Sequence, residues 1–293
     1  MSRTKAAVLG APIRHSLSPV LHRAAYRELK LFDWSYERIE VDEAALPGFI
    51  AGLSREWAGL SLTMPLKRAV IPFLDQISDT AAAVEAVNTV VLTDDGRLVG
   101  DNTDVPGLVA ALEERGVGQV SNAAILGAGA TASSALAALS KISVGDVTVY
   151  TRSVRRATEV RQWGDRLGVS VRTADWATAA AAFAAPLVIA TTPAGATDEL
   201  AVCVPPSPGT LFDVVYDPWP TGLAAAWSCK GGTLLGGMDL LVHQAVLQVE
   251  LMTGCRRAPL AAMRAAGERA LRDRSASAHR AGSDALLSPV QGR

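Results

Sequence analysis

Cysteine, aromatic residues and net charge are all scarce in this chain of 293 residues. It has 3 cysteines, 5% aromatic residues and a formal net charge of -1. Cys203, Cys229 and Cys255 are odd in number and lack the close spacing of metal ligands, so the sequence predicts neither a disulfide framework nor a zinc site. We expect no metal, and we expect the three thiols to be small buried groups or inert ones.

Long hydrophobic runs are also missing. The longest apolar stretch, residues 179–190, is shorter than the ~20 residues that a membrane helix requires, and it contains Pro186. A short apolar run near the N-terminus is interrupted by Gly10 and Pro12, and no small-residue cleavage site follows it. The arginines are scattered among acids and form no basic stripe. The sequence therefore predicts a cytoplasmic protein with neither a membrane nor a nucleic acid as partner.

Short strands and amphipathic helices alternate along most of the chain, which is 49% hydrophobic. The alternation starts at about residue 5, and residues 88–100 predict a β-hairpin. It resumes from about residue 105 and ends near residue 272. This predicts an α/β fold with two domains. Residues 273–293 lose apolar periodicity and gather Ser, Ala, Gly and Arg, which predicts a disordered, dispensable tail.

A glycine-rich turn organises the second half. Residues 123–126 are an apolar strand that stops at Gly127, and Gly127, Gly129 and Ala132 have the spacing of the dinucleotide fingerprint. A second apolar strand at residues 147–150 completes a βαβ unit, and the intervening helix would point its free N–H groups at a pyrophosphate. A turn that serves packing alone is the alternative, and the βαβ context favours the nucleotide.

The end of the second strand indicates which nucleotide. An NAD site usually has an acid there, whereas residues 151–156 read Thr-Arg-Ser-Val-Arg-Arg. Guanidinium groups suit the 2′-phosphate of NADP, which an acid would repel. The alternative is a solvated first helical turn, although positive charge there opposes the helix dipole. The sequence therefore favours NADP.

Six further motifs occur in a fixed order. They are PIRHSLSP at residues 12–19, SLTMPLK at 61–67, AVNT at 86–89, NTD at 102–104, DVVYDP at 213–218 and LVHQA at 241–245. With the glycine turn in its expected place, this set resembles shikimate dehydrogenase over roughly residues 5–270. The resemblance implies a reversible NADPH-dependent reduction of 3-dehydroshikimate to shikimate, in the pathway of aromatic amino-acid biosynthesis. It also implies a substrate domain at 1–103, completed by helices at 239–272, and a Rossmann-type, doubly wound NADP domain at 104–238.

The resemblance also implies the site residues. Lys67 would exchange the proton, with Asp104 as its charge partner. The substrate would be bound by Ser16, Ser18, Thr63, Asn88, Tyr216 and Gln244. The cofactor would be bound by Gly127, Ala128, Gly129, Ala130, Thr151, Arg152, Ser153, Arg155, Arg156, Thr192 and Gly237.

Some of these residues have a plainer interpretation. Ser16 and Ser18 are two apart, so in an extended loop their hydroxyls face one side and can reach one anion, but Ser18 is also suited to cap a helix. Asp104 is likewise suited to be an N-cap. The resemblance needs neither His15 nor the other histidines His22 and His243, which we interpret as structural.

Three departures and two competing functions stay open. Ser61 stands where many members have Asn, Leu240 stands where Met is common, and the Met usual after Gly195 is missing. A quinate/shikimate dehydrogenase is one alternative, although it would usually prefer NAD. A non-catalytic paralogue that binds nucleotide and senses a metabolite is the other, although it predicts loss of Lys67 or Asp104. We expect a monomer or a homodimer.

Overall fold

The computed structural model describes residues 4–143 and 145–286, and describes side chains as far as residue 276. Its strands are β1 (Lys5–Gly10), β2 (Ser35–Glu40), β3 (Trp57–Leu62), β4 (Gln76–Ile77), β5 (Thr89–Leu92), β6 (Leu98–Asp101), β7 (Ala123–Leu126), β8 (Val147–Thr151), β9 (Val171–Asp175), β10 (Leu187–Ala190), β11 (Thr210–Asp213) and β12 (Thr233–Leu235). Its α-helices are α1 (Ser18–Glu28), α2 (Leu46–Ala51), α3 (Leu66–Ala69), α4 (Asp79–Val84), α5 (Asp104–Glu114), α6 (Ala130–Ile142), α7 (Val154–Leu167), α8 (Gly222–Cys229), α9 (Gly237–Thr253) and α10 (Leu260–Leu286). Three 3-10 helices are η1 (Ile71–Phe73), η2 (Trp176–Ala184) and η3 (Asp198–Cys203).

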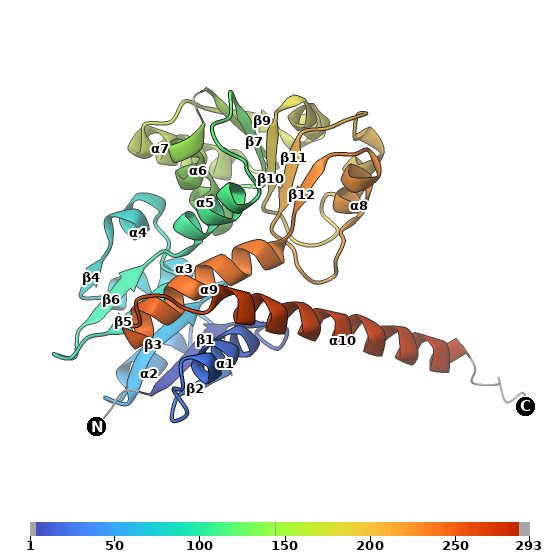
Figure 1. Ribbon diagram of the computed structural model, residues 1–293. Helices are drawn as coiled ribbons and strands as arrows, with labels where there is room; N and C mark the ends of the chain where they lie inside the picture. Colours follow the sequence, from blue (N-terminus) through green and yellow to red (C-terminus); the bar gives the residue numbers. More distant parts are fainter. Residues whose placement is uncertain (1–3, 144, 287–293) are drawn as a thin grey trace, which may run out of the picture.

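The strands form two separate six-stranded sheets, which lie in two lobes (Figure 1). The first has the order β2-β1-β3-β5-β6-β4, with β1 parallel to both of its neighbours. The predicted hairpin is present, because β5 pairs antiparallel with β6 around a turn in which Gly96 has a φ of 87°. The mixed sheet is covered by short helices on the side of α2 and by α1 and α9 on the other.

The second sheet is parallel throughout and has the order β12-β11-β10-β7-β8-β9. The four residues of β7 and the four of β10 are all buried, as expected for central strands covered by helices on both faces. The chain leaves β7 toward β8 on one side and continues from β10 on the other. This reversal is the topological switch point of a doubly wound sheet, where ligands bind at the carboxyl ends of the strands. The predicted two-domain α/β class with a Rossmann-type domain is confirmed.

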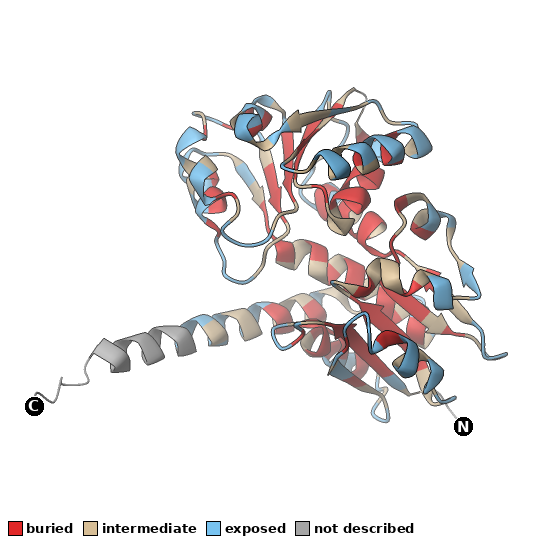
Figure 2. Cartoon of the chain, turned by 180° about the vertical axis from the view of Figure 1, so that it is seen from behind, coloured by how far each residue is buried: buried red, intermediate tan, exposed pale blue. Residues whose placement is uncertain are grey.

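Helices α5 and α9 connect the two lobes. They pack on each other, while α5 also contacts α6, and α9 contacts α1, α10, β3 and β5. Figure 2 shows buried residues along both sheets and along α9. The Asn102 side chain, also buried, donates to the carbonyl of Ala86 and to Ser134 Oγ of α6, so it joins the lobes by hydrogen bonds. The two lobes are therefore joined by the packing of α5 on α9 and on α6 and by the hydrogen bonds of Asn102.

The disordered tail predicted from residue 273 is wrong for its first part. Helix α10 continues without a break to Leu286, and Arg274 donates to the carbonyl of His15 and to the carboxylate of Asp217. These partners are 259 and 57 positions away, so local apolar periodicity gave no sign of them. Residues 287–293 of the predicted tail lie outside the described residues.

Two remaining features of the chain are the exposure of its cysteines and the length of its helices. Cys203 and Cys229 are exposed rather than buried, and Cys255 is partly exposed. Within the described part of the chain, no helix combines the length and the apolar character that crossing a membrane requires.

Candidate active site

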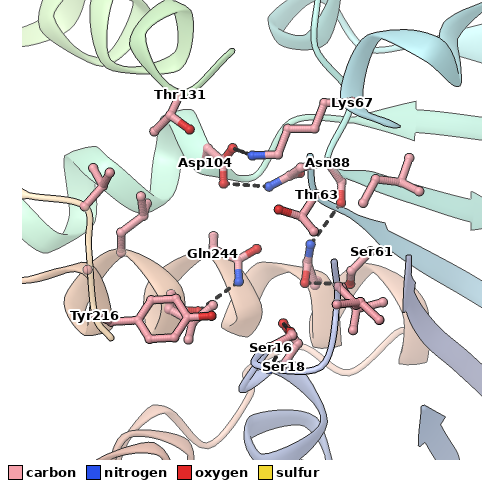
Figure 3. A pocket seen from close by; sticks show the side chains of 18 of the residues that line it. Ser16, Ser18, Ser61, Thr63, Lys67, Asn88, Asp104, Thr131, Tyr216 and Gln244 are labelled. Carbon is pink, nitrogen blue, oxygen red and sulfur yellow. Dashed lines mark hydrogen bonds and ion pairs between the residues drawn. The ribbon is translucent and has the colours of Figure 1, made fainter. Parts of the chain in front are cut away.

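A cavity of about 270 Å³ lies beside α9, and we call it the central cavity. Its walls come from β1, β3, α3, α5, the loop before α1 and the loop after β11. All eight residues predicted to bind substrate or to act in catalysis line it (Figure 3): Ser16, Ser18, Thr63, Lys67, Asn88, Asp104, Tyr216 and Gln244. Positions as far apart as 16 and 244 are therefore brought together in one pocket.

Lys67 and Asp104 form an ion pair in the wall of the cavity. Lys67 Nζ is 2.6 Å from Asp104 Oδ2, and the two side chains are only 15% and 7% exposed. Asp104 is not the N-cap of α5, because its backbone N–H and that of Val105 donate to the buried Asn102 side chain. The carboxylate is thus free of a capping role, and the ammonium is held where it faces the cavity.

Asn88 has an amide whose orientation is fixed by its surroundings. Its Oδ1 accepts from Thr89 Oγ1 at 2.8 Å and from both N–H and Oγ1 of Thr103 at 2.8 and 3.1 Å. Because all three donors meet the oxygen, Nδ2 must point the other way, and it donates to Asp104 Oδ1 at 2.8 Å. Asn88 therefore holds the second oxygen of the carboxylate that pairs with Lys67.

Ser16 and Ser18 present their hydroxyls side by side, with the two oxygens 3.3 Å apart. Ser18 is the first residue of α1, and the N-cap is Leu17, without a side-chain bond. The capping interpretation of Ser18 is therefore wrong. Two hydroxyls at a helix N-terminus form a site suited to an anion.

A buried polar network supports this wall from behind. Tyr36 OH donates to Ser61 Oγ at 2.6 Å, and Ser61 Oγ donates to Gln248 Oε1 at 2.8 Å. Gln248 Nε2 donates to Thr89 Oγ1 at 3.0 Å, which in turn donates to Asn88. A continuous chain of hydrogen bonds thus runs from Tyr36 to the Lys67 ion pair. Burial raises the pKa of Tyr36 far above its usual value, so it remains a donor.

Sequence reasoning missed Gln248, which lines the cavity and is 1% exposed. Its signal was present, since it lies four positions after Gln244 and one helical turn places both on the same face of α9. Ser61, which departs from the family pattern, accepts a hydrogen bond from Tyr36 and donates one to Gln248. Its hydroxyl is therefore part of the network that supports the cavity wall. His22 accompanies them as a structural group, stacked on Tyr36 with ring centroids 3.8 Å apart.

Tyr216 and Gln244 complete the cavity opposite the ion pair (Figure 3). Gln244 Nε2 donates to the carbonyl of Leu241 in its own helix, at 2.9 Å. Burial raises the pKa of Tyr216, which keeps its hydroxyl protonated. The two residues therefore offer polar atoms for the hydroxyl groups of a small ring.

The glycine turn has the geometry of a phosphate site. Gly127 has a φ of 106°, and a Cβ there would lie 2.8 Å from Thr191 Oγ1 and 3.1 Å from Thr192 Cγ2. Only glycine fits that conformation and contact. Gly129, the N-cap of α6, has open space where a Cβ would be, so a ligand can approach its backbone. The predicted residues Ala128 and Ala130 continue this turn into the helix.

In the cationic turn after β8, one of three guanidinium groups has no acidic partner among the residues that the structure describes. Arg152 is exposed and lies over the ring of Trp176, with its Cζ 5.1 Å from the centroid. Arg155 and Arg156 instead pair with Glu159, at 3.6 and 2.8 Å. Ser153 caps α7 by accepting from the N–H of Arg156 at 3.3 Å, and its own N–H donates to Thr151 Oγ1.

Most of the predicted cofactor residues lie outside the lining of the central cavity, and Gly237 is the exception. A Cβ on Gly237 would collide with the carbonyl oxygen of Val214, so glycine is required for close packing there. Thr131, in the first turn of α6 after the glycines, also lines the cavity. Gly237 and Thr131 therefore mark where the nucleotide side meets the cavity. Among the described residues, no cluster of three or more His, Cys, Asp or Glu is arranged to hold a metal.

Comparisons with known proteins agree on one family. A sequence model described as the shikimate dehydrogenase substrate binding domain matches residues 8–90, and one described as the shikimate 5'-dehydrogenase C-terminal domain matches residues 237–266. A shikimate dehydrogenase (NADP(+)) of Oleidesulfovibrio alaskensis is 36% identical over 267 residues, covering 88% of this chain and 92% of that protein.

Solved structures lead to the same family. The crystal structure of Mycobacterium tuberculosis shikimate dehydrogenase has a TM-score of 0.83 and 41% identity, covering 91% of this chain and 99% of that one. The Thermus thermophilus shikimate 5-dehydrogenase in complex with NADP(H) and shikimate has a TM-score of 0.79 and 33% identity, covering 92% of this chain and 100% of that one.

Proposed function

Because this chain belongs to the shikimate dehydrogenase family, we propose that it reduces 3-dehydroshikimate to shikimate with NADPH, reversibly. The observation that carries the proposal is the Lys67–Asp104 ion pair in the wall of a cavity whose opposite end presents the hydroxyls of Ser16 and Ser18. A cationic donor and an anion site in one pocket suit a substrate that has a carbonyl group and a carboxylate.

The residues have distinct parts in the reaction. When bound, the nicotinamide supplies the hydride. Lys67 donates a proton to the oxygen that becomes a hydroxyl, and it accepts that proton in the reverse direction. Asp104 orients the ammonium and contacts a neighbouring substrate hydroxyl. Ser16 and Ser18 hold the carboxylate, so that the ring lies along α9 with its carbonyl near Lys67.

Further polar groups select the ring. Thr63, Asn88 and Gln244 meet its hydroxyl groups, and Tyr216 closes the side toward the nucleotide. A site that hydrogen-bonds each hydroxyl discriminates against analogues that lack one, because its own buried groups are then left unpaired.

The cofactor would be held by the glycine turn and the cationic turn. Gly127, Ala128, Gly129 and Ala130 offer backbone N–H groups to the pyrophosphate. Arg152 is the main ligand for the 2′-phosphate, since it has no acidic partner among the described residues and rests on Trp176. Arg155 and Arg156 assist by charge, Thr151 and Ser153 line the same turn, and Thr192 and Gly237 border the dinucleotide.

The test is one assay with matched substrates and cofactors. Purified protein is given shikimate or quinate with NADP or NAD, and reduced cofactor is followed by absorbance. We expect shikimate with NADP to give the highest kcat/KM. It should exceed that for shikimate with NAD by at least about tenfold, because one contact between a guanidinium group and a phosphate contributes roughly that factor. Higher kcat/KM for quinate with NAD would make it a quinate dehydrogenase. Nucleotide binding without turnover of either acid would make it a metabolite sensor.

The proposal includes the organisation and setting of the chain. Residues 1–103 with helices at 239–272 form the substrate domain and 104–238 the NADP domain, supported by one sheet in each segment. A cytoplasmic location is supported by three unpaired cysteines, two of them exposed, which suit a reducing compartment. The assembly is a monomer or a homodimer, which light scattering after size exclusion would distinguish.

A further inference from the structure

Two arginines hold the loop that carries the paired serines from its outer side. Arg38 Nε, on β2, donates to the carbonyl of Ser16 at 2.7 Å. Arg274 Nη1, on α10, donates to the carbonyl of His15 at 2.9 Å. Consecutive carbonyls of one short loop are thus bound by guanidinium groups from two elements that are remote in the sequence. We call Arg38 and Arg274 the arginine pair.

The positive charge of the arginine pair is only partly balanced. Arg274 lies 3.2 Å from Asp217 Oδ2, with 31% of its side chain exposed. Arg38 has no acidic partner in the part of the chain whose side chains are described, and its donor meets a neutral carbonyl. Arg23, which donates to the carbonyl of Tyr36, adds a third charge nearby. This side of the loop therefore has a surplus of positive charge.

The charges of the arginine pair act on Tyr216, which lines the central cavity. Burial raises the pKa of Tyr216 and the charge of Asp217 adds to that rise, whereas the charges of Arg274 and Arg38 oppose it. Burial lowers the pKa of Arg38, and repulsion from Arg274 and Arg23 lowers it further. Because Tyr216 lines the central cavity beside the serine loop, an anion that approaches Ser16 and Ser18 enters the same field.

We propose that Arg38 and Arg274 are positioning residues that fix the loop of Ser16 and Ser18 and attract the substrate carboxylate to it. The inference rests on the proposed function and deepens it. Arg274 also ties the loop to Asp217, next to Tyr216, so α10 joins the anion end of the cavity to the loop after β11. A chain ending at residue 272 lacks this residue, and we expect it to bind substrate more weakly, contrary to the dispensable tail that the sequence predicted.

The experiment compares Arg38→Gln, Arg274→Gln, the double variant and Arg274→Lys with the wild type. Arg27→Gln is the control, because Arg27 is exposed in the last turn of α1 and its removal changes net charge equally. KM and kcat for shikimate are measured between about 0.01 M and about 0.15 M salt, which shortens the Debye length from roughly 30 Å to roughly 8 Å.

We expect each Gln variant to raise the KM for shikimate about twofold to fivefold, and the double variant roughly tenfold, with kcat and the KM for NADP nearly unchanged. The fall of kcat/KM with salt should become shallower in the Gln variants. Arg274→Lys, which keeps the charge, should keep most of that salt dependence. A purely structural role would alter KM without altering its salt dependence.

The outcomes separate this inference from the proposed function. If the wild type turns over shikimate and the Gln variants match its KM and salt dependence, the arginine pair has no part in binding. If the wild type turns over no shikimate, the proposed function fails. In that case, isothermal titration with shikimate tests the arginine pair. Salt-dependent binding that the wild type shows and the double variant loses supports its part in binding. Binding that is unchanged in the double variant, or absent from the wild type, overturns it.

Discussion

Replacing Gln248 by Met is expected to destabilise the fold while leaving the cavity lining almost unchanged in volume. Gln248 Oε1 accepts from Ser61 at 2.8 Å and from His22 Nε2 at 3.4 Å, and its Nε2 donates to Thr89 Oγ1 and to the carbonyl of Asn88. Methionine keeps the length of the side chain but makes none of these four hydrogen bonds.

The loss of stability depends on which hydrogen-bond partners of Gln248 keep another partner after the substitution. The Asn88 carbonyl still accepts from the N–H of Leu62, and Thr89 still donates to Asn88, so neither is stranded. The Ser61 hydroxyl and His22 Nε2 both lose their acceptor inside the protein. Ser61 still accepts from Tyr36, but two buried donors left without an acceptor cost roughly 2 to 5 kcal/mol in free energy of unfolding, which corresponds to a fall of about 4 to 10 °C in Tm for a chain of this size.

The matched control is Gln244→Met, the same change one turn earlier on α9. Among the described residues, Gln244 donates to the carbonyl of Leu241 in its own helix, at the wall of the cavity where water can replace it. We expect its Tm to change by less than about 2 °C while the KM for shikimate rises about threefold to tenfold. Thermal unfolding followed by circular dichroism, together with steady-state kinetics, measures both. An unchanged Tm in Gln248→Met would refute the reasoning about stranded partners.

Results are also expected for four other variants. Lys67→Ala should lower kcat by roughly 10² to 10⁴ with little change in substrate affinity, and Asp104→Asn should impair both; near-normal turnover in a folded Lys67→Ala protein would remove the acid-base role. Arg152→Ala should raise the KM for NADP about tenfold to hundredfold and leave that for NAD nearly unchanged, so equal effects on both would count against it. Burial lowers the pKa of His22 to about 3 in the folded protein. As pH falls from about 6.5 toward 3, the unfolded chain protonates His22 and the folded chain does not, so the free energy of unfolding decreases. His22→Phe, which preserves the stack on Tyr36, should remove about 2 kcal/mol of the loss measured by urea unfolding between about pH 7 and about pH 5, and an identical pH dependence would contradict this.

The parts of the site that depend on local spacing were predictable. Two serines two positions apart do place their hydroxyls together, and the turn at Gly127 has the positive φ that its fingerprint requires. Lys67 and Asp104 are 37 positions apart, and their pairing was predicted only through resemblance to a family. The physical reason is that the tertiary fold brings Lys67 of α3 and Asp104, the first residue of α5, to 2.6 Å, which no local pattern encodes.

What the sequence did not predict depends on partners distant along the chain. Arg274 lies beyond the last apolar periodicity, and its contacts with His15 and Asp217 exist only once α10 is seated on α1. Cys203 and Cys229 are exposed, since each is the last residue of its helix and is placed by the packing of its neighbours. Trp176, which lies under Arg152, comes from a 3-10 helix that follows a different strand.

The turn that carries Arg152 follows β8 of the second sheet, whereas Lys67 follows β3 of the first, and Arg152 is not among the residues that line the central cavity. We therefore expect the choice of nicotinamide cofactor and the choice of acid substrate to be separable. If Arg152 binds the 2′-phosphate as proposed, we expect exchange of the turn at 151–156 for one that ends in an acid to shift the cofactor preference toward NAD while the substrate pocket stays the same. Selection, natural or directed, can thus act on either preference alone.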